Sequence, residues 1–167
     1  AHKNGRIETT ANVRVIQNRF YIEEEATLTL GISNGALEVS GDNFTGLTQA
    51  EGPGGGAFYV AGTLSADKEI VLSNNRAKKG GSLYLSGDGE FIAQALTVQN
   101  SFSTTDGGGC GIYFAGTGQH TLTNLTVINN NTIGNGAGIY VRGDDEGNSG
   151  TLVVSGGSLI SGNKSTL

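Results

Sequence analysis

The residues that could carry out chemistry in this chain are few and scattered. Histidine occurs only at His2 and His120, and neither has a companion at the spacing of a metal site or a catalytic triad. The carboxylate cluster Asp144-Asp145-Glu146 is followed by Gly147-Asn148 and is typical of a solvated loop. Paired catalytic carboxylates need rigid neighbouring strands instead. We therefore predict a non-enzymatic protein with no catalytic residue, no metal site and no cofactor.

All five tyrosines lie in one repeated phrase of an apolar residue, Tyr and a second apolar residue. Small residues precede it in every copy except the degenerate first one, Phe20-Tyr21-Ile22. From Tyr59 onward the tyrosines are 25, 29 and 27 residues apart. Periods of this size are typical of solenoid proteins rather than of ordinary globular cores. The five residues are Tyr21, Tyr59, Tyr84, Tyr113 and Tyr140.

These tyrosines alternate with the apolar residues of the same phrase, so we expect them to face outward, away from the core. Coils stacked about 4.8 Å apart would align the rings as a ladder. With small neighbours such as Ala57 and Ser82, this outward aromatic stripe could bind sugar rings or partner side chains. The alternative is structural: the rings stabilise neighbouring coils by stacking, or they lie under a folded-back loop.

A second phrase, two apolar residues in alternation followed after two spacers by a short polar residue, occurs five times, and a sixth copy has only Ile160 before Asn163. Alternation of period two indicates a strand. Asn, Asp and Ser after a strand tolerate left-handed backbone and bond to nearby main chain, so we predict a structural ladder of turn residues and about six coils. The ladder consists of Asn18, Asp42, Asn75, Ser101, Asn130 and Asn163.

A third strand fits between the two phrases, around residues 27–29, 63–65, 91–92, 121–123 and 151–153. Three short parallel strands per coil predict an all-β chain folded as a right-handed parallel β-helix. The composition agrees, because 36% hydrophobic residues with 29 glycines are few for a compact globule but suit a solenoid with a narrow core. The inward row is predicted at Phe58, Leu83, Ile112 and Ile139, with Val60, Leu85, Phe114 and Val141 beside them.

The single cysteine, Cys110, excludes an internal disulfide and any cysteine-based metal site. It stands where Gly56, Gly81 and Ala137 stand in the other copies of the tyrosine phrase. We interpret it as a small buried residue that fills space, with a reactive thiol as the alternative.

Charge and hydropathy exclude two classes of partner for this segment. The net charge is −5 and the lysines and arginines are scattered, whereas nucleic-acid binding needs a concentrated basic face. No apolar run approaches 18 residues, so the segment itself is not expected to insert in a membrane. The chain stops within a coil, and we expect residues 1–167 to be one β-helix segment cut from a longer repeat protein.

Threonine pairs raise an ice-binding surface as a further idea. Thr27 and Thr29 recur as Thr121 and Thr123, but the array breaks at residues 90–92 and at Val153. Threonine also simply favours strands.

The two phrases together resemble the polymorphic outer-membrane protein repeats of chlamydial autotransporter passengers, whose paired motifs are Gly-Gly-Ala-(Ile/Leu/Val) and Phe-x-x-Asn. Residues 72–77 followed by 80–84 form the closest stretch, Gly55-Gly56-Ala57 is the one literal Gly-Gly-Ala, and aliphatic residues stand in place of Phe. The resemblance extends from about Val13 to Asn163.

This resemblance implies an adhesin-like β-helix that is secreted or displayed on the cell surface, with the bacterial outer membrane as the expected location. It also implies attachment to a protein or glycan on host or neighbouring cells, and a membrane-embedded domain further along the parent chain. A β-helix that binds or cleaves polysaccharides is the alternative.

Overall fold

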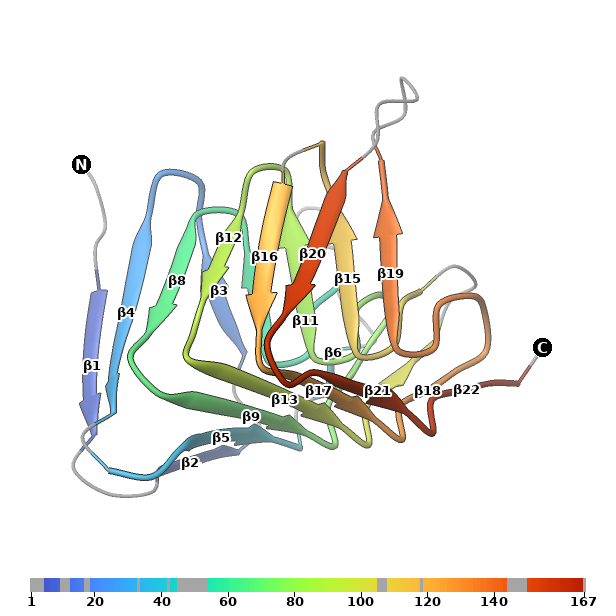
Figure 1. The fold of residues 1–167 in the computed structure, drawn as a ribbon, viewed down its shortest axis with the longest axis horizontal. Coiled ribbons are helices and arrows are strands. Elements are labelled where there is room, and N and C mark those ends of the chain that lie inside the picture. Colours follow the sequence, from blue (N-terminus) through green and yellow to red (C-terminus); the bar gives the residue numbers. More distant parts are fainter. Residues whose placement is uncertain are drawn as a thin grey trace.

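The computed structural model describes residues 5–9, 13–16, 19–32, 34–41, 43–44, 54–104, 108–117, 119–143 and 150–166. Within these ranges every regular element is a β-strand, and every strand pairing is parallel. The strands stack into a β-solenoid with the N-terminus at one end and the C-terminus at the other (Figure 1). The predicted all-β parallel β-helix is therefore confirmed, with about four turns rather than about six.

The largest sheet has six strands, one for each copy of the second phrase. In spatial order they are β2 (Val13–Ile16), β5 (Leu37–Ser40), β9 (Glu69–Ser73), β13 (Ala95–Gln99), β17 (Leu125–Ile128) and β21 (Leu159–Ser161). Their register aligns the apolar alternation of each copy with the next, as at Leu96↔Leu125 and Val98↔Val127.

The tyrosine phrases form a second sheet, which we call the tyrosine sheet. Its strands are β3 (Phe20–Ile22), β7 (Phe58–Val60), β11 (Leu83–Ser86), β15 (Ile112–Ala115) and β19 (Ile139–Arg142). Each tyrosine pairs in register with the tyrosine of the adjacent coil.

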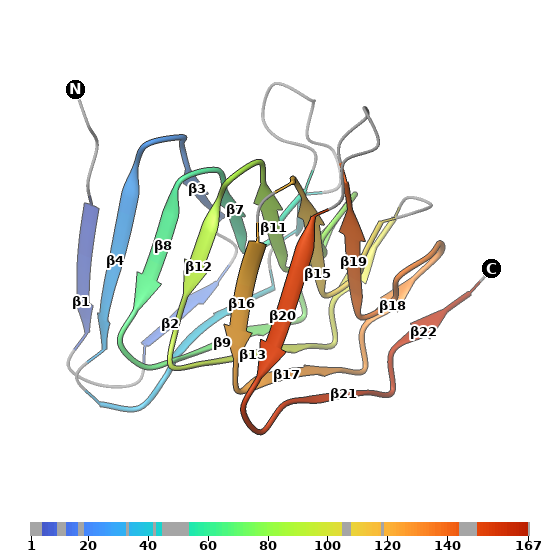
Figure 2. The same cartoon turned by 45° about the horizontal axis from the view of Figure 1, so that its top comes forward.

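The third predicted strand is present in every coil, but its sheet is divided in two parts, together called the split sheet. One part has four strands: β1 (Gly5–Thr9), β4 (Thr27–Ile32), β8 (Thr63–Ala66) and β12 (Glu90–Ile92). The other has two: β16 (Gln119–Thr123) and β20 (Thr151–Ser155). Figure 2 shows β12 and β16 as neighbours on the same face of the solenoid.

A fourth strand, two residues long, follows five of the six strands of the largest sheet, after the polar corner, and was not predicted. These strands are β6 (Asn43–Phe44), β10 (Arg76–Ala77), β14 (Phe102–Ser103), β18 (Asn131–Thr132) and β22 (Lys164–Ser165). Two residues are too few to show an alternating pattern, which is why periodicity could not reveal them.

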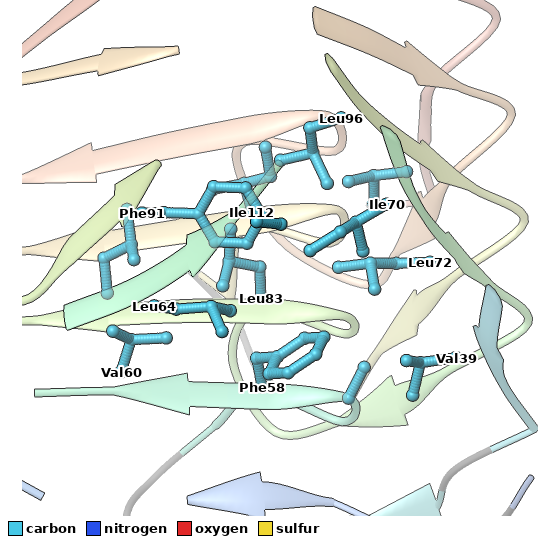
Figure 3. Packing of buried hydrophobic residues seen from close by; sticks show 14 of the residues in the cluster. Val39, Phe58, Val60, Leu64, Ile70, Leu72, Leu83, Phe91, Leu96 and Ile112 are labelled. Carbon is cyan, nitrogen blue, oxygen red and sulfur yellow. The ribbon is translucent and has the colours of Figure 1, made fainter. Parts of the chain in front are cut away.

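The core is one narrow apolar row inside the coil, as solenoids require. Phe58, Leu83 and Ile112 are fully buried and point inward together with residues of the other sheets (Figure 3). The predicted inward row is thus confirmed for the inner coils. In the last coil Ile139 is only partly buried and Val141 is exposed, because no described strand pairs with the outer edge of β19.

Candidate functional site: the tyrosine and asparagine ladders

The five tyrosine rings form a continuous stack along the outer side of the tyrosine sheet. Ring centroids of successive tyrosines are 4.6, 5.2, 4.9 and 5.3 Å apart, and the planes are inclined by 5, 10, 4 and 24°. The parallel register sets this spacing, because it places identical side chains one strand apart. The predicted ladder is therefore present.

The rings lie on the opposite side of their strands from the core, as predicted, and form a cluster of their own. The expectation of an open stripe is nevertheless wrong for the three inner rings. Tyr59, Tyr84 and Tyr113 are only 8, 6 and 1% exposed, whereas Tyr21 is 49% exposed and Tyr140 is partly buried. Only the two ends of the ladder offer aromatic surface to a partner.

Glycine-rich turns contribute to this burial. A Cβ atom placed on Gly54 would lie 2.6 Å from Tyr84 Cδ2, and one on Gly80 would lie 3.1 Å from Tyr113 Cβ. Each of these turns precedes one tyrosine strand and packs on the tyrosine of the next coil, and glycine is needed for such a close approach. The structural alternative for the tyrosines was stacking between coils or cover by a folded-back loop. The structure shows stacked rings whose inner members are packed against by glycine turns.

Cationic side chains lie beside the stack, and the phenol of Tyr84 stays neutral. The Arg19 guanidinium is 5.5 Å from the Tyr21 ring and 5.2 Å from the Tyr59 ring, within the range of cation–π attraction. Burial, with the neighbouring Tyr113 and Tyr59, raises the pKa of Tyr84 well above its ordinary value. Tyr84, in the middle of the ladder, is therefore uncharged at physiological pH.

The second ladder lies inside the coil and links successive coils through main-chain bonds. Asn130 Nδ2 donates to the Val98 carbonyl (3.1 Å), and its Oδ1 accepts from the Ser101 N–H (2.9 Å). Asn163 repeats this bonding with Val127 and with the Asn130 N–H.

The other described residues of the ladder are buried, and they too bond to the main chain. Asn75 donates to the Val39 carbonyl (3.1 Å), as Asn130 does to Val98. Asn75, Ser101 and Asn130 are all at most 1% exposed. Asn18 and Asp42 lie outside the described residues.

The residue with left-handed backbone conformation lies one position before the ladder residue of each corner. Asn74, Asn100 and Asn129 have φ angles of 57, 53 and 56°, and Gly41 and Gly162 occupy the same place in other coils. The short polar residue of the phrase is thus the hydrogen-bonding position, and its predecessor makes the turn.

Cys110 is fully buried, with Sγ 2.8 Å from the Ser101 carbonyl and 2.7 Å from the Asn131 carbonyl. Burial raises the pKa of its thiol to about 12. These features favour the space-filling interpretation over a reactive thiol, because the thiolate is the reactive form.

His120 is the residue that sequence reasoning undervalued. It points inward on β16, is 6% exposed, and meets Phe114 edge to face with ring centroids 4.1 Å apart. Burial lowers the pKa of its imidazole, and the nearby Glu90 and Asp88 carboxylates offset part of that effect. The alternation of Gln119, His120, Thr121 and Leu122 was the available signal.

Neither a metal centre nor a membrane span is found within the described ranges. No group of three or more His, Cys, Asp or Glu side chains lies close enough to hold a metal ion there. The same part of the chain contains no helix long and apolar enough to cross a bilayer. His2 and Asp144-Asp145-Glu146 lie outside it.

No protein family, curated protein or solved structure matches this chain. The structure establishes a parallel β-solenoid, and the resemblance to outer-membrane repeats depends on the residue pattern alone.

Proposed function

We propose that this chain is a non-enzymatic β-helix segment of a secreted or cell-surface protein, and that it acts in attachment as an adhesin of the autotransporter-passenger type. The observation that supports this proposal most directly is the in-register stacking of the coils. Side chains of one kind recur in rows along a rigid shaft, as in the five-membered tyrosine stack. Weak contacts repeated along such a shaft add through effective concentration.

The accessible parts of the tyrosine ladder are its two ends. Tyr21 has half of its surface free and lies against Arg19, which supplies a cation beside an aromatic face. Aromatic side chains with a polar tip contribute large contact area at low entropic cost. A surface protein or glycan on a host or neighbouring cell is the proposed partner, and the bacterial outer membrane is the proposed location.

Retention of the fluorescently labelled chain on cells, and on arrays of glycans and surface proteins, tests this proposal. We expect saturable retention that falls in the Tyr21→Ala/Tyr140→Ala double variant. Leu159→Ala is the matched control, because Leu159 is also exposed at the C-terminal end but belongs to a different sheet. Retention that is absent, or equal in all three proteins, would overturn the proposal for these tyrosines.

Polysaccharide binding is the second candidate, because a groove with a polar lining lies between β12 and β16. Incubation with pectins, alginates and glycosaminoglycans separates binding from cleavage. New reducing ends or unsaturated products would show an enzyme, and the non-enzymatic proposal predicts that none are formed.

A further inference from the structure

The last coil of the solenoid leaves the apolar core open at one end. Val141 on β19, Val154 on β20 and Ile160 on β21 each pair in register with a core residue that is at most 3% exposed. They therefore belong to the inward row, yet they are 41, 38 and 53% exposed. No described strand pairs with the outer edges of these three strands. Three sheets thus end together in one apolar surface, which we call the C-terminal face (Figure 1).

The first coil is open in the same three sheets, where the outer edges of β3, β1 and β2 have no partner among the described strands. Ile7 pairs with the buried Leu30, so it belongs to the inward row, but it is itself 41% exposed. Leu28 pairs with Gly5, which has no side chain to cover it. A hollow of about 340 Å³ lies at this end, lined by Leu28 and Phe20 among other residues. We call these edges, together with the hollow, the N-terminal face.

The two faces match each other strand by strand. β19 and β3 belong to the tyrosine sheet, β20 and β1 to the split sheet, and β21 and β2 to the largest sheet. All six strands pair in parallel with their neighbours. A second copy that continues the coil after one strand spacing, about 4.8 Å, would therefore pair each outer strand with the outer strand of the same sheet.

The side chains along the tyrosine sheet agree with this pairing. The rows of this sheet are in register from β3 to β19, so Tyr140 would stack on Tyr21 of the second copy. Arg142 and Glu23, each two residues further along, carry opposite charges and are exposed, which favours contact between these two faces. Two C-terminal faces brought together would run antiparallel, and that direction breaks the register of the tyrosine rows.

We propose that the C-terminal face of one copy binds the N-terminal face of a second copy, so that the chain assembles head to tail. An unpaired strand edge is a template for pairing with another chain. A contact between two different faces repeats without closing and gives filaments. The assembly does not depend on the attachment role, because Tyr21 and Tyr140 are uncovered on single copies at low concentration, where retention on cells is measured.

Sedimentation velocity of the 167-residue chain at increasing concentration tests the proposal. We expect species of growing size that dissociate on dilution. Ile160→Lys in the C-terminal face and Ile7→Lys in the N-terminal face should each weaken the association at least tenfold, because burying an unpaired charge is costly. Ile92→Lys is the matched control, since Ile92 is 48% exposed on a middle coil, and it should associate like the unmodified chain. A chain that is monomeric at every concentration, or equal weakening by Ile92→Lys, overturns the proposal.

Mixing the two variants separates head-to-tail contact from contact between like faces. Ile7→Lys keeps its C-terminal face and Ile160→Lys keeps its N-terminal face, so an equimolar mixture should form dimers that grow no further. If Ile7→Lys alone associates as tightly as the unmodified chain, two C-terminal faces bind each other and the proposal is wrong. Circular dichroism checks the fold of each variant, and Val154→Lys or Tyr21→Lys replaces a variant that fails to fold.

Discussion

At the residue scale, the asparagine ladder shows how one side chain can hold two coils together. Asn130 donates to one main-chain carbonyl and accepts from one main-chain N–H of the preceding coil, inside a site with 0% exposure. Removing the amide would take one hydrogen bond from each of these main-chain groups, and the loss of a hydrogen bond at a buried site is costly.

Asn130→Ala is therefore expected to lower the free energy of unfolding by about 2–4 kcal/mol. Asn131→Ala is the matched control, because the buried Oδ1 atom of Asn131 has no partner. This variant should lose less than about 1 kcal/mol in the free energy of unfolding. Urea denaturation followed by circular dichroism measures both. Equal losses would mean that the ladder bonds contribute no special stability.

Cys110 should be inert in the folded chain. With its pKa raised to about 12 and its side chain fully buried, almost no thiolate is present at pH 8. We expect labelling by a thiol reagent only after denaturation. Rapid labelling of the native chain would instead revive the reactive-thiol alternative.

His120 should make stability depend on pH. The fold lowers the pKa of its imidazole below the ordinary value of 6.5, so folding favours the neutral form. Its contribution is complete above the unfolded pKa and declines as the pH falls below about 6.5. Between pH 7.5 and 5.5, the free energy of unfolding should therefore fall more steeply for the unmodified chain than for His120→Leu. Parallel plots of this free energy against pH for the two proteins would contradict the prediction.

At the element scale, the corners decide where each strand ends. Five successive corners have a left-handed residue immediately before the ladder position, supplied by Asn at three corners and by Gly at two. Asn and Gly adopt this conformation at little cost, whereas other residues lose about 1 kcal/mol or more. The corner thus turns the chain out of the six-stranded sheet and into the short fourth strand.

Asn100, exposed and with φ of 53°, isolates this effect from packing. Asn100→Gly should change the free energy of unfolding by less than about 0.5 kcal/mol, and Asn100→Ala should lower it by about 1 kcal/mol. Thermal unfolding of the two variants gives the comparison. If the alanine variant is as stable as the glycine variant, the left-handed backbone conformation at this position does not affect stability.

At the scale of the whole molecule, stability comes from coils that cover one another. Residues of inner coils are buried by neighbours on both sides, whereas Val154, Leu159 and Ile160 in the last coil are 38, 53 and 53% exposed. In a solenoid each repeat contacts only its neighbours, so the cost of a substitution depends on its place in the stack.

Leu125 and Leu159 allow a matched comparison, with 0 and 53% exposure. Leu125→Ala should cost about 2–5 kcal/mol through lost burial and a residual cavity. Leu159→Ala should cost less than about 0.5 kcal/mol. Chemical denaturation of the two variants checks the prediction, and similar losses would mean that the last coil is covered in solution.

Much of this architecture could be predicted because its signals are local. Period-two alternation placed the inward row at Phe58 and Leu83, and the recurrence of the tyrosine phrase placed the rings in register. The two-residue strands were missed because they are too short for periodicity to detect. The corner was placed one residue late, because Asn occurs both at the turn and at the bonding position.

The sequence by itself determined the repeat, the strands and the side of each strand that faces the core, since these follow from spacing along a single coil. Only the tertiary structure decided which outward residues stay accessible. Tyr113 is covered because a glycine turn from the preceding coil packs on it, and a groove opens between β12 and β16 because the two strands do not join. Both outcomes depend on how closely successive coils approach each other, and the spacing of residues within one coil does not encode that approach.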